Sequence, residues 1–152
     1  MPSRRDQIRM SEDELRGFLS ERKVMTCATL GPGGRPHLMP LWYVPDGDTL
    51  RGWTYAASQK ARNLERDPHA TVQVEAGVEY HELRGAMLEC DVALTRDVER
   101  VVEVGVALFE RYGASGSEVR AMVEKQAPKR VRLDFTPTRT VTWDHRKLGG
   151  VY

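Results

Sequence analysis

The sequence predicts a mainly β fold with flanking helices, in which antiparallel strands curl into a barrel. Stretches in which apolar and polar residues alternate predict about seven strands, against about four helical stretches. Most of the strands are joined by tight turns, and such turns join antiparallel neighbours. Strands on this hairpin path tend to close on themselves, because closure removes exposed edges. The 152 residues are enough for a sizeable core, and we expect a single domain over residues 1–152.

The first part of the chain predicts one capped helix followed by three strands. Ser11 and Glu14 have the spacing of a capping box, and an apolar stripe follows them. The period then changes to two, which predicts strands over residues 23–30 and 37–44 around the turn GPGGRP. A second turn, PDGD, leads into a strand over residues 49–56.

The middle of the chain predicts a short helix and two more strands. Ser58 is a good N-cap residue, and Asp67-Pro68 ends the helix. A strand over residues 69–76 follows, and Gly77 marks a turn. A long strand then covers about residues 81–94.

The last part predicts two helices and two closing strands. Apolar residues recur with helical spacing over residues 98–112, and Gly113 can close this helix. The next helix is expected to run from a cap at Ser115 to Pro128. The closing strands cover residues 130–135 and 138–143.

Composition argues against several classes of partner. The net charge of +1 gives no electrostatic footprint for nucleic acid or for an anionic membrane. No apolar run approaches the roughly 20 residues that span a bilayer, and the N-terminus has no apolar core of a secretory signal. Cys27 and Cys90 lie inside predicted strands, so we expect two small buried hydrophobes and a reduced, cytoplasmic setting.

Motifs for the commonest catalytic sites are missing from the sequence. The four histidines show no metal-ligand spacing, so we predict no metal site. There is no G-x-S-x-G, and neither cysteine has an activating context, so no catalytic side chain is predicted. The GPGGRP turn lacks the third glycine of a dinucleotide motif, and a strand follows it.

The segment SQKARN, which begins at Ser58, has an unusual order of charges. Lys60 and Arg62 lie in the first helical turn, where the helix dipole already places positive partial charge. One interpretation is an ordinary surface helix with a solvated lysine. The other is an anion site, in which free backbone N–H groups, a serine hydroxyl and a lysine converge on a phosphate.

Aromatic residues gather on the strands just before this helix. Trp42, Tyr43, Trp53 and Tyr55 can be core residues, which is the usual explanation, or they can flank a planar phosphate-bearing ring such as a flavin. Pro40 cannot donate a ladder hydrogen bond, so we expect an edge strand or an irregularity there.

Residues 54–89, TYAASQKARNLERDPHATVQVEAGVEYHELRGAMLE, resemble the central segment of the pyridoxamine 5'-phosphate oxidase-like split-barrel superfamily. The similarity is greatest to its flavin- and deazaflavin-dependent oxidoreductases, which use FMN or coenzyme F420. It extends over roughly residues 10–148 in the order of the elements. The resemblance implies a split β-barrel of the FMN-binding type and a homodimer with two cofactor sites at the subunit interface.

The resemblance also implies the residues of the cofactor site. Ser58, Gln59 and Lys60 match the positions that hold the cofactor phosphate, and Arg62 and Asn63 are weaker candidates for it. The complete predicted site consists of Met39, Pro40, Leu41, Trp53, Thr54, Ser58, Gln59, Lys60, Arg62 and Asn63. In this set Trp53 and Thr54 line the ring, and the backbone of Met39 to Leu41 runs beside it. The C-terminal Trp143 to Lys147 is expected to approach the site, from the other subunit.

Two departures from the family pattern bear on the cofactor. Pyridoxamine 5'-phosphate oxidases have two basic side chains where this chain has Gln59 and Lys60, and their basic C-terminal R-x-H motif is replaced here by WDHRKLGGVY. We therefore expect F420 as the cofactor, with FMN as the alternative, and hydride transfer to a small organic substrate. An acidic cofactor tail is assigned to Arg35, Arg51, Arg84 and Lys147. A non-catalytic flavin carrier and a vitamin B6 oxidase remain the alternative functions.

Overall fold

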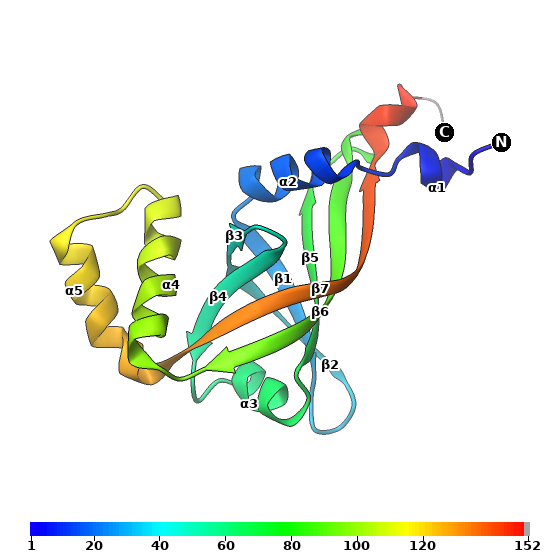
Figure 1. Cartoon of the computed structure of the whole chain (residues 1–152). Helices are drawn as coiled ribbons and strands as arrows, with labels where there is room; N and C mark the ends of the chain where they lie inside the picture. Colours follow the sequence, from blue (N-terminus) through cyan, green and yellow to red (C-terminus); the bar gives the residue numbers. More distant parts are fainter. Residues whose placement is uncertain (151–152) are drawn as a thin grey trace.

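The computed structural model describes residues 1–150, and in these residues seven strands form one antiparallel sheet (Figure 1). The strands are β1 Val24–Leu30, β2 Pro36–Trp42, β3 Val44–Asp46, β4 Thr49–Tyr55, β5 His69–Ala76, β6 Arg84–Thr95 and β7 Arg130–Asp144. Their order in the sheet is β2-β1-β5-β6-β7-β4-β3, and the sheet curls into a half-barrel. The prediction of a mainly β, split-barrel fold is confirmed.

Helices flank this sheet at both ends of the half-barrel (Figure 1). The α-helices of residues 1–150 are α1 Arg4–Gln7, α2 Glu12–Glu21, α3 Gln59–Arg66, α4 Val98–Arg111 and α5 Ser117–Gln126. Short 3-10 turns cover Tyr80–Glu82, Ala127–Lys129 and His145–Leu148. The predicted capping box at Ser11 and Glu14 is confirmed at the start of α2. Gly113, with φ of +81°, follows α4 as predicted.

Several element predictions were wrong in detail, among them the turn at residues 45–48, where Val44–Asp46 forms the short strand β3. The four-residue helix α1 was missed, although Ser3 and Asp6 form a capping box there. Helix α5 begins at Ser117, because Gly116 with φ of +103° is its N-cap and no side chain caps it. The long strand begins at Arg84, since the residues before it turn as a 3-10 helix.

The two predicted closing strands are one strand, β7. Pro137 has no backbone N–H to donate to a neighbouring strand, so a strand is expected to end near it. The structure accommodates it with a bulge: Glu89 pairs with Arg139 and Cys90 pairs with Pro137, so Thr138 is the extra residue. The Thr138 hydroxyl donates to the carbonyl of Glu89 at 3.1 Å. One continuous strand therefore pairs with β6 along its length and with β4 through its first half.

Two clusters of buried hydrophobic residues hold the helices against the sheet. The larger lies inside the half-barrel and includes residues of α2 and α3, such as Phe18 and Leu64. The smaller lies between β4 and helices α4 and α5. At its centre the Trp53 indole covers Gly105, where an added Cβ would lie 2.5 Å from the ring. Helices α4 and α5 are thus held on the β4 side, at the left of Figure 1.

Cys27 and Cys90 are buried and unpaired, as predicted. Burial raises the pKa of the Cys27 thiol to about 11 and that of Cys90 to about 12. We expect neither thiol of the folded protein to react with an aromatic disulfide reagent at about pH 8, because the reactive thiolate is scarce and shielded. Both should react after denaturation. Labelling of the native protein at the rate of free cysteine would contradict this burial.

Within residues 1–150, no helix is both long enough and apolar enough to cross a bilayer.

Candidate cofactor site

Helix α3 begins with a conventional cap. The side chain of Ser58 accepts a hydrogen bond from the N–H of Ala61 at 3.1 Å. The N–H of Arg62 donates to the Ser58 carbonyl at 3.2 Å. The N–H groups of Gln59 and Lys60 stand at the first two helical positions, which have no partner within a helix. The helix start therefore offers an external anion two backbone donors and the hydroxyl proton of Ser58.

Lys60 turns its side chain into the protein. The residue is only 6% exposed, and burial lowers the pKa of its ammonium group. Its Nζ lies 3.5 Å from Thr54 Oγ1, and no carboxylate of residues 1–150 forms an ion pair with it. A buried charge without a counterion is costly, so such groups are normally paired. Lys60 is consequently a positive charge that the described chain leaves uncompensated.

Thr54 connects the lysine to the helix cap. Its Oγ1 lies 3.3 Å from Ser58 Oγ as well as 3.5 Å from Lys60 Nζ. Two hydroxyls and one ammonium group thus converge beside the free backbone N–H groups of α3. This is the donor set that binds a phosphate at a helix N-terminus. The family resemblance assigned Thr54 to the cofactor ring. In the structure its hydroxyl lies instead beside Ser58 and Lys60, the predicted phosphate contacts.

The other predicted phosphate residues differ in their exposure. Asn63 is fully buried, and its side chain bonds to Gln59 and Thr29. The Gln59 side chain is exposed and donates to Asn63 Oδ1 at 2.8 Å. Arg62 lies on the exposed face of α3. Direct phosphate contacts by these three side chains stay predictions.

Core packing accounts for two of the four aromatic residues. Trp53 is 8% exposed and packs against Gly105, and the buried Tyr43 donates its hydroxyl proton to the Leu19 carbonyl at 2.6 Å. Trp42 stacks on Tyr112 with ring centroids 3.8 Å apart. Because neighbouring residues of a strand point to opposite faces, the Trp53 indole and the Thr54 hydroxyl lie on different sides of β4. That Trp53 lines the cofactor ring stays a prediction.

Strand β2 is the edge strand that Pro40 predicted. It stands first in the sheet order and pairs with β1, with Pro40 opposite Thr26. An edge strand tolerates proline, because its outer N–H groups have no strand to bond. Met39 and Pro40 are exposed and Leu41 is half-buried. This leaves the strand open to a ligand, and its contact with the cofactor stays a prediction.

The basic residues assigned to an acidic tail are mostly engaged. Arg84 forms two hydrogen bonds with Glu21, and Lys147 bonds to Glu14 at 2.8 Å. Arg51 is paired with Asp46. The fourth, Arg35, lies exposed in the turn between β1 and β2.

Sequence reasoning did not single out Arg130. Its guanidinium lies over the rings of Tyr55 and Trp53, at 3.9 and 4.4 Å from their centroids. Among the described residues no carboxylate pairs with it. The pairing of β4 with β7 brings Arg130 next to Tyr55 and Trp53. Because Arg130 is far from both in the sequence, no local pattern could predict their contact.

The C-terminal segment lies away from α3 in its own chain. Trp143 packs over Gly85, and His145 contacts the Tyr80 carbonyl at 2.9 Å. This end is at the top of Figure 1, whereas α3 is at the bottom. The approach of this segment to a cofactor from the other subunit stays a prediction.

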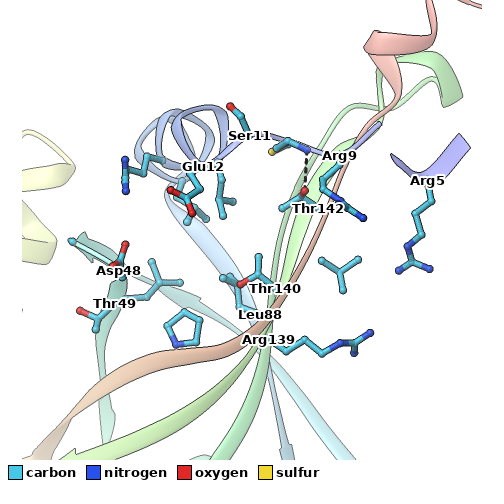
Figure 2. A pocket seen from close by; sticks show the side chains of 18 residues that line it. Arg5, Arg9, Ser11, Glu12, Asp48, Thr49, Leu88, Arg139, Thr140 and Thr142 are labelled. Carbon is cyan, nitrogen blue, oxygen red and sulfur yellow. Dashed lines mark hydrogen bonds between the residues drawn. The ribbon is translucent and has the colours of Figure 1, made fainter. Parts of the chain in front are cut away.

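A separate cavity of about 780 Å³ lies between α2, the turn before β4 and the bulged part of β7 (Figure 2). Met10 N donates to Thr142 Oγ1 at 2.9 Å at its wall. Two of the arginines that line it are paired within the chain, Arg9 with Asp6 and Arg139 with Glu89. None of the predicted cofactor residues lines this cavity. In residues 1–150 no cluster of three or more His, Cys, Asp or Glu side chains is arranged to hold a metal ion.

Comparison with known proteins places this architecture in a family. The profile of the pyridoxamine 5'-phosphate oxidase family matches residues 11–144. A conserved hypothetical protein from Mycobacterium tuberculosis is 39% identical, with a TM-score of 0.90 over 99% of this chain and 95% of that one. An F420 reductase is 23% identical, with a TM-score of 0.66 over 82% of this chain and 94% of the other. The heme storage protein HutZ from Vibrio cholerae is 21% identical, with a TM-score of 0.69 over 86% of this chain and 94% of the other. Among curated proteins there is no significant match. The chain belongs to the pyridoxamine 5'-phosphate oxidase family.

Proposed function

We propose that this protein is an oxidoreductase that binds a phosphate-bearing flavin-type cofactor at the start of α3. In this proposal F420 is the cofactor, FMN is the alternative, and a small organic molecule is the substrate. The observation that carries the proposal is the uncompensated ammonium group of Lys60, buried beside the hydroxyls of Thr54 and Ser58. A phosphate bound there would supply the missing negative charge.

The residues present fit such a phosphate. Lys60 would hold it by charge, Ser58 and Thr54 by their hydroxyls, and the N–H groups of Gln59 and Lys60 by backbone hydrogen bonds. When bound, the cofactor supplies the hydride chemistry. The protein then has to orient the cofactor and exclude water from it. These roles require no acid–base pair from the protein, and the predicted residues contain none.

The preference for F420 over FMN rests on the neutral residue at position 59. The basic side chain expected of a pyridoxamine 5'-phosphate oxidase is replaced by Gln59, whose amide is already bonded to Asn63. Vitamin B6 oxidation is the weaker alternative for this reason. A solved structure with this fold is an F420 reductase, which is compatible with the preference.

We also propose that two copies of the chain form the complete site. The exposed side chains of β2 include Leu38, 58% exposed, and Met39, 46% exposed. Apolar residues on an open edge strand favour association. A second copy on this edge would cover the exposed Met39 and Pro40, beside which the family resemblance places the cofactor ring.

The choice of cofactor is tested by titration of the apo-protein. F420 and FMN are added separately, and their fluorescence is followed. We expect F420 to bind at least about tenfold more tightly, which corresponds to about 1.4 kcal/mol. Tighter binding of FMN would reverse the assignment, and no binding of either would contradict the proposal.

A non-catalytic carrier is the second candidate, because one protein of this fold is a heme storage protein. The two functions differ in turnover. With reduced F420 and a panel of quinones, enones and tetrapyrroles, an enzyme oxidises the coenzyme faster than the uncatalysed background. Tight binding of the coenzyme with no oxidation above background would favour the carrier.

A further inference from the structure

Asn63 joins α3 to the sheet through a buried hydrogen bond. It is fully buried, and its Nδ2 donates to Thr29 Oγ1 of β1 at 3.0 Å. Thr29 is itself only 3% exposed. Because both partners are shielded from water, the bond cannot be exchanged for one to solvent, and loss of either partner leaves an unsatisfied polar group.

The same asparagine is bonded to the first residue of the helix. Its Oδ1 accepts a hydrogen bond from Gln59 Nε2 at 2.8 Å and a longer one from Arg66 at 3.4 Å. A continuous chain of hydrogen bonds therefore runs from Thr29 through Asn63 to Gln59. We call these three residues the Thr29 relay. It ends at the residue whose backbone N–H faces the candidate phosphate.

Helix α3 needs such a fixed point. It has eight residues and ends at Arg66, so its own hydrogen bonds give it little stability. Ala61 and Leu64 bury its apolar side, and apolar contacts set the depth of a helix but are not directional. A buried hydrogen bond has a preferred direction, and it can fix the rotation of the helix about its axis.

From this arrangement we infer that Thr29 is a positioning residue of the anion site. Through Asn63 it fixes the rotation of α3, and with it the direction of the Ser58 hydroxyl and of the two free N–H groups. Thr29 itself does not touch the ligand. The inference rests on the proposed function, since it assumes that the start of α3 binds the cofactor phosphate.

The experiment measures how strongly the protein prefers FMN over riboflavin, which lacks the phosphate. The ratio of the two dissociation constants reports on the phosphate end alone, because the rings are identical. Thr29→Val removes the hydroxyl and keeps the shape of the side chain. We expect it to reduce the preference for FMN by about threefold to tenfold, the size of one hydrogen bond. Thr29→Ser keeps the hydroxyl and should keep the preference.

Thr142→Val is the matched control. Thr142 is also a buried threonine, 9% exposed, and its hydroxyl accepts a hydrogen bond from the Met10 N–H near α2. This variant should lose stability and keep the preference for FMN. Should Thr29→Val not fold, Thr29→Ala removes the same hydroxyl and adds no atom.

The possible outcomes separate a failure of the Thr29 relay from a failure of the proposed phosphate site. A wild-type protein that binds FMN and riboflavin equally would overturn the anion site itself. A wild-type preference that survives in Thr29→Val would overturn only the Thr29 relay. An equal loss in Thr142→Val would show that general destabilisation causes the effect, and this too would overturn the relay.

Discussion

Replacing Lys60 with methionine is expected to stabilise the fold while it weakens the binding of F420 or FMN. Methionine fills a similar volume without a charge, so the variant no longer buries an ammonium group that has no carboxylate partner. We expect the free energy of unfolding to rise by about 1 to 3 kcal/mol. Cofactor affinity should fall by about 1.5 to 3 kcal/mol, as for a lost hydrogen bond to a charged group. Urea unfolding and fluorescence titration measure the two quantities.

Opposite changes in stability and affinity are the signature of a residue kept for its ligand. Lys125→Met, at an exposed lysine of α5, is the control and should change neither quantity by more than about 0.5 kcal/mol. A Lys60→Met protein that loses stability and keeps its cofactor affinity would show that the lysine has a structural role.

The stabilisation by Lys60→Met should depend on pH. Burial lowers the pKa of Lys60 below its ordinary value of 10.5, so the folded state binds its proton less readily than the unfolded state. The buried ammonium charge therefore destabilises the wild type fully at pH values below the folded pKa. This destabilisation decreases as the pH rises towards 10.5, because the folded state then loses the proton. The difference between variant and wild type should be largest at neutral pH and should shrink in alkali. Subtraction removes the effect of the Cys90 thiol, which both proteins share, whereas the charge of Lys60 lowers the pKa of Cys27 in the wild type alone.

Replacing Trp53 with alanine is expected to reduce the free energy of unfolding by about 3 to 5 kcal/mol. The indole fills the space between β4 and helices α4 and α5, against Gly105 and beneath the guanidinium of Arg130. Its removal leaves a cavity that the backbone of α4 cannot close. Under conditions in which the variant is folded, its FMN affinity should change little, because the indole faces away from Thr54. Denaturant unfolding and fluorescence titration test both statements.

Trp42→Ala provides the comparison. Trp42 is 39% exposed and should contribute less to stability. If Trp53→Ala folds as well as wild type and loses FMN binding, the indole lines the ring as the family resemblance implied, and its packing on Gly105 is secondary.

Local rules were enough to predict most of the elements that hold the site. Serine caps at Ser11 and Ser58 predicted the starts of α2 and α3, since capping depends on residues only three positions apart. Pro40 predicted the edge position of β2 for an equally local reason. Local rules failed most clearly for β7, where a long-range partner strand accommodates Pro137 in a bulge.

The arrangement of the side chains in the candidate site was harder to predict than the elements that carry them. The charge order of residues 58–62 indicated an anion, yet no pattern could show that Lys60 points inward or that it lacks a counterion. That depends on which residues of β1 and β4 face α3. The partnership of Asn63 with Thr29 spans 34 positions in the sequence and is invisible for the same reason.

The continuity of β7 has a consequence for how the chain folds. Strand β4 joins the sheet through β7, and Tyr55 meets Arg130 in that pairing. The hairpin of β3 and β4 is synthesised early, yet its place in the sheet exists only after the last strand has formed. Pairings so distant in sequence slow folding, because the entropy of closing a long loop is lost before the contacts form. The strand that directly precedes the cap of α3 therefore reaches its place in the sheet only after β7 has formed.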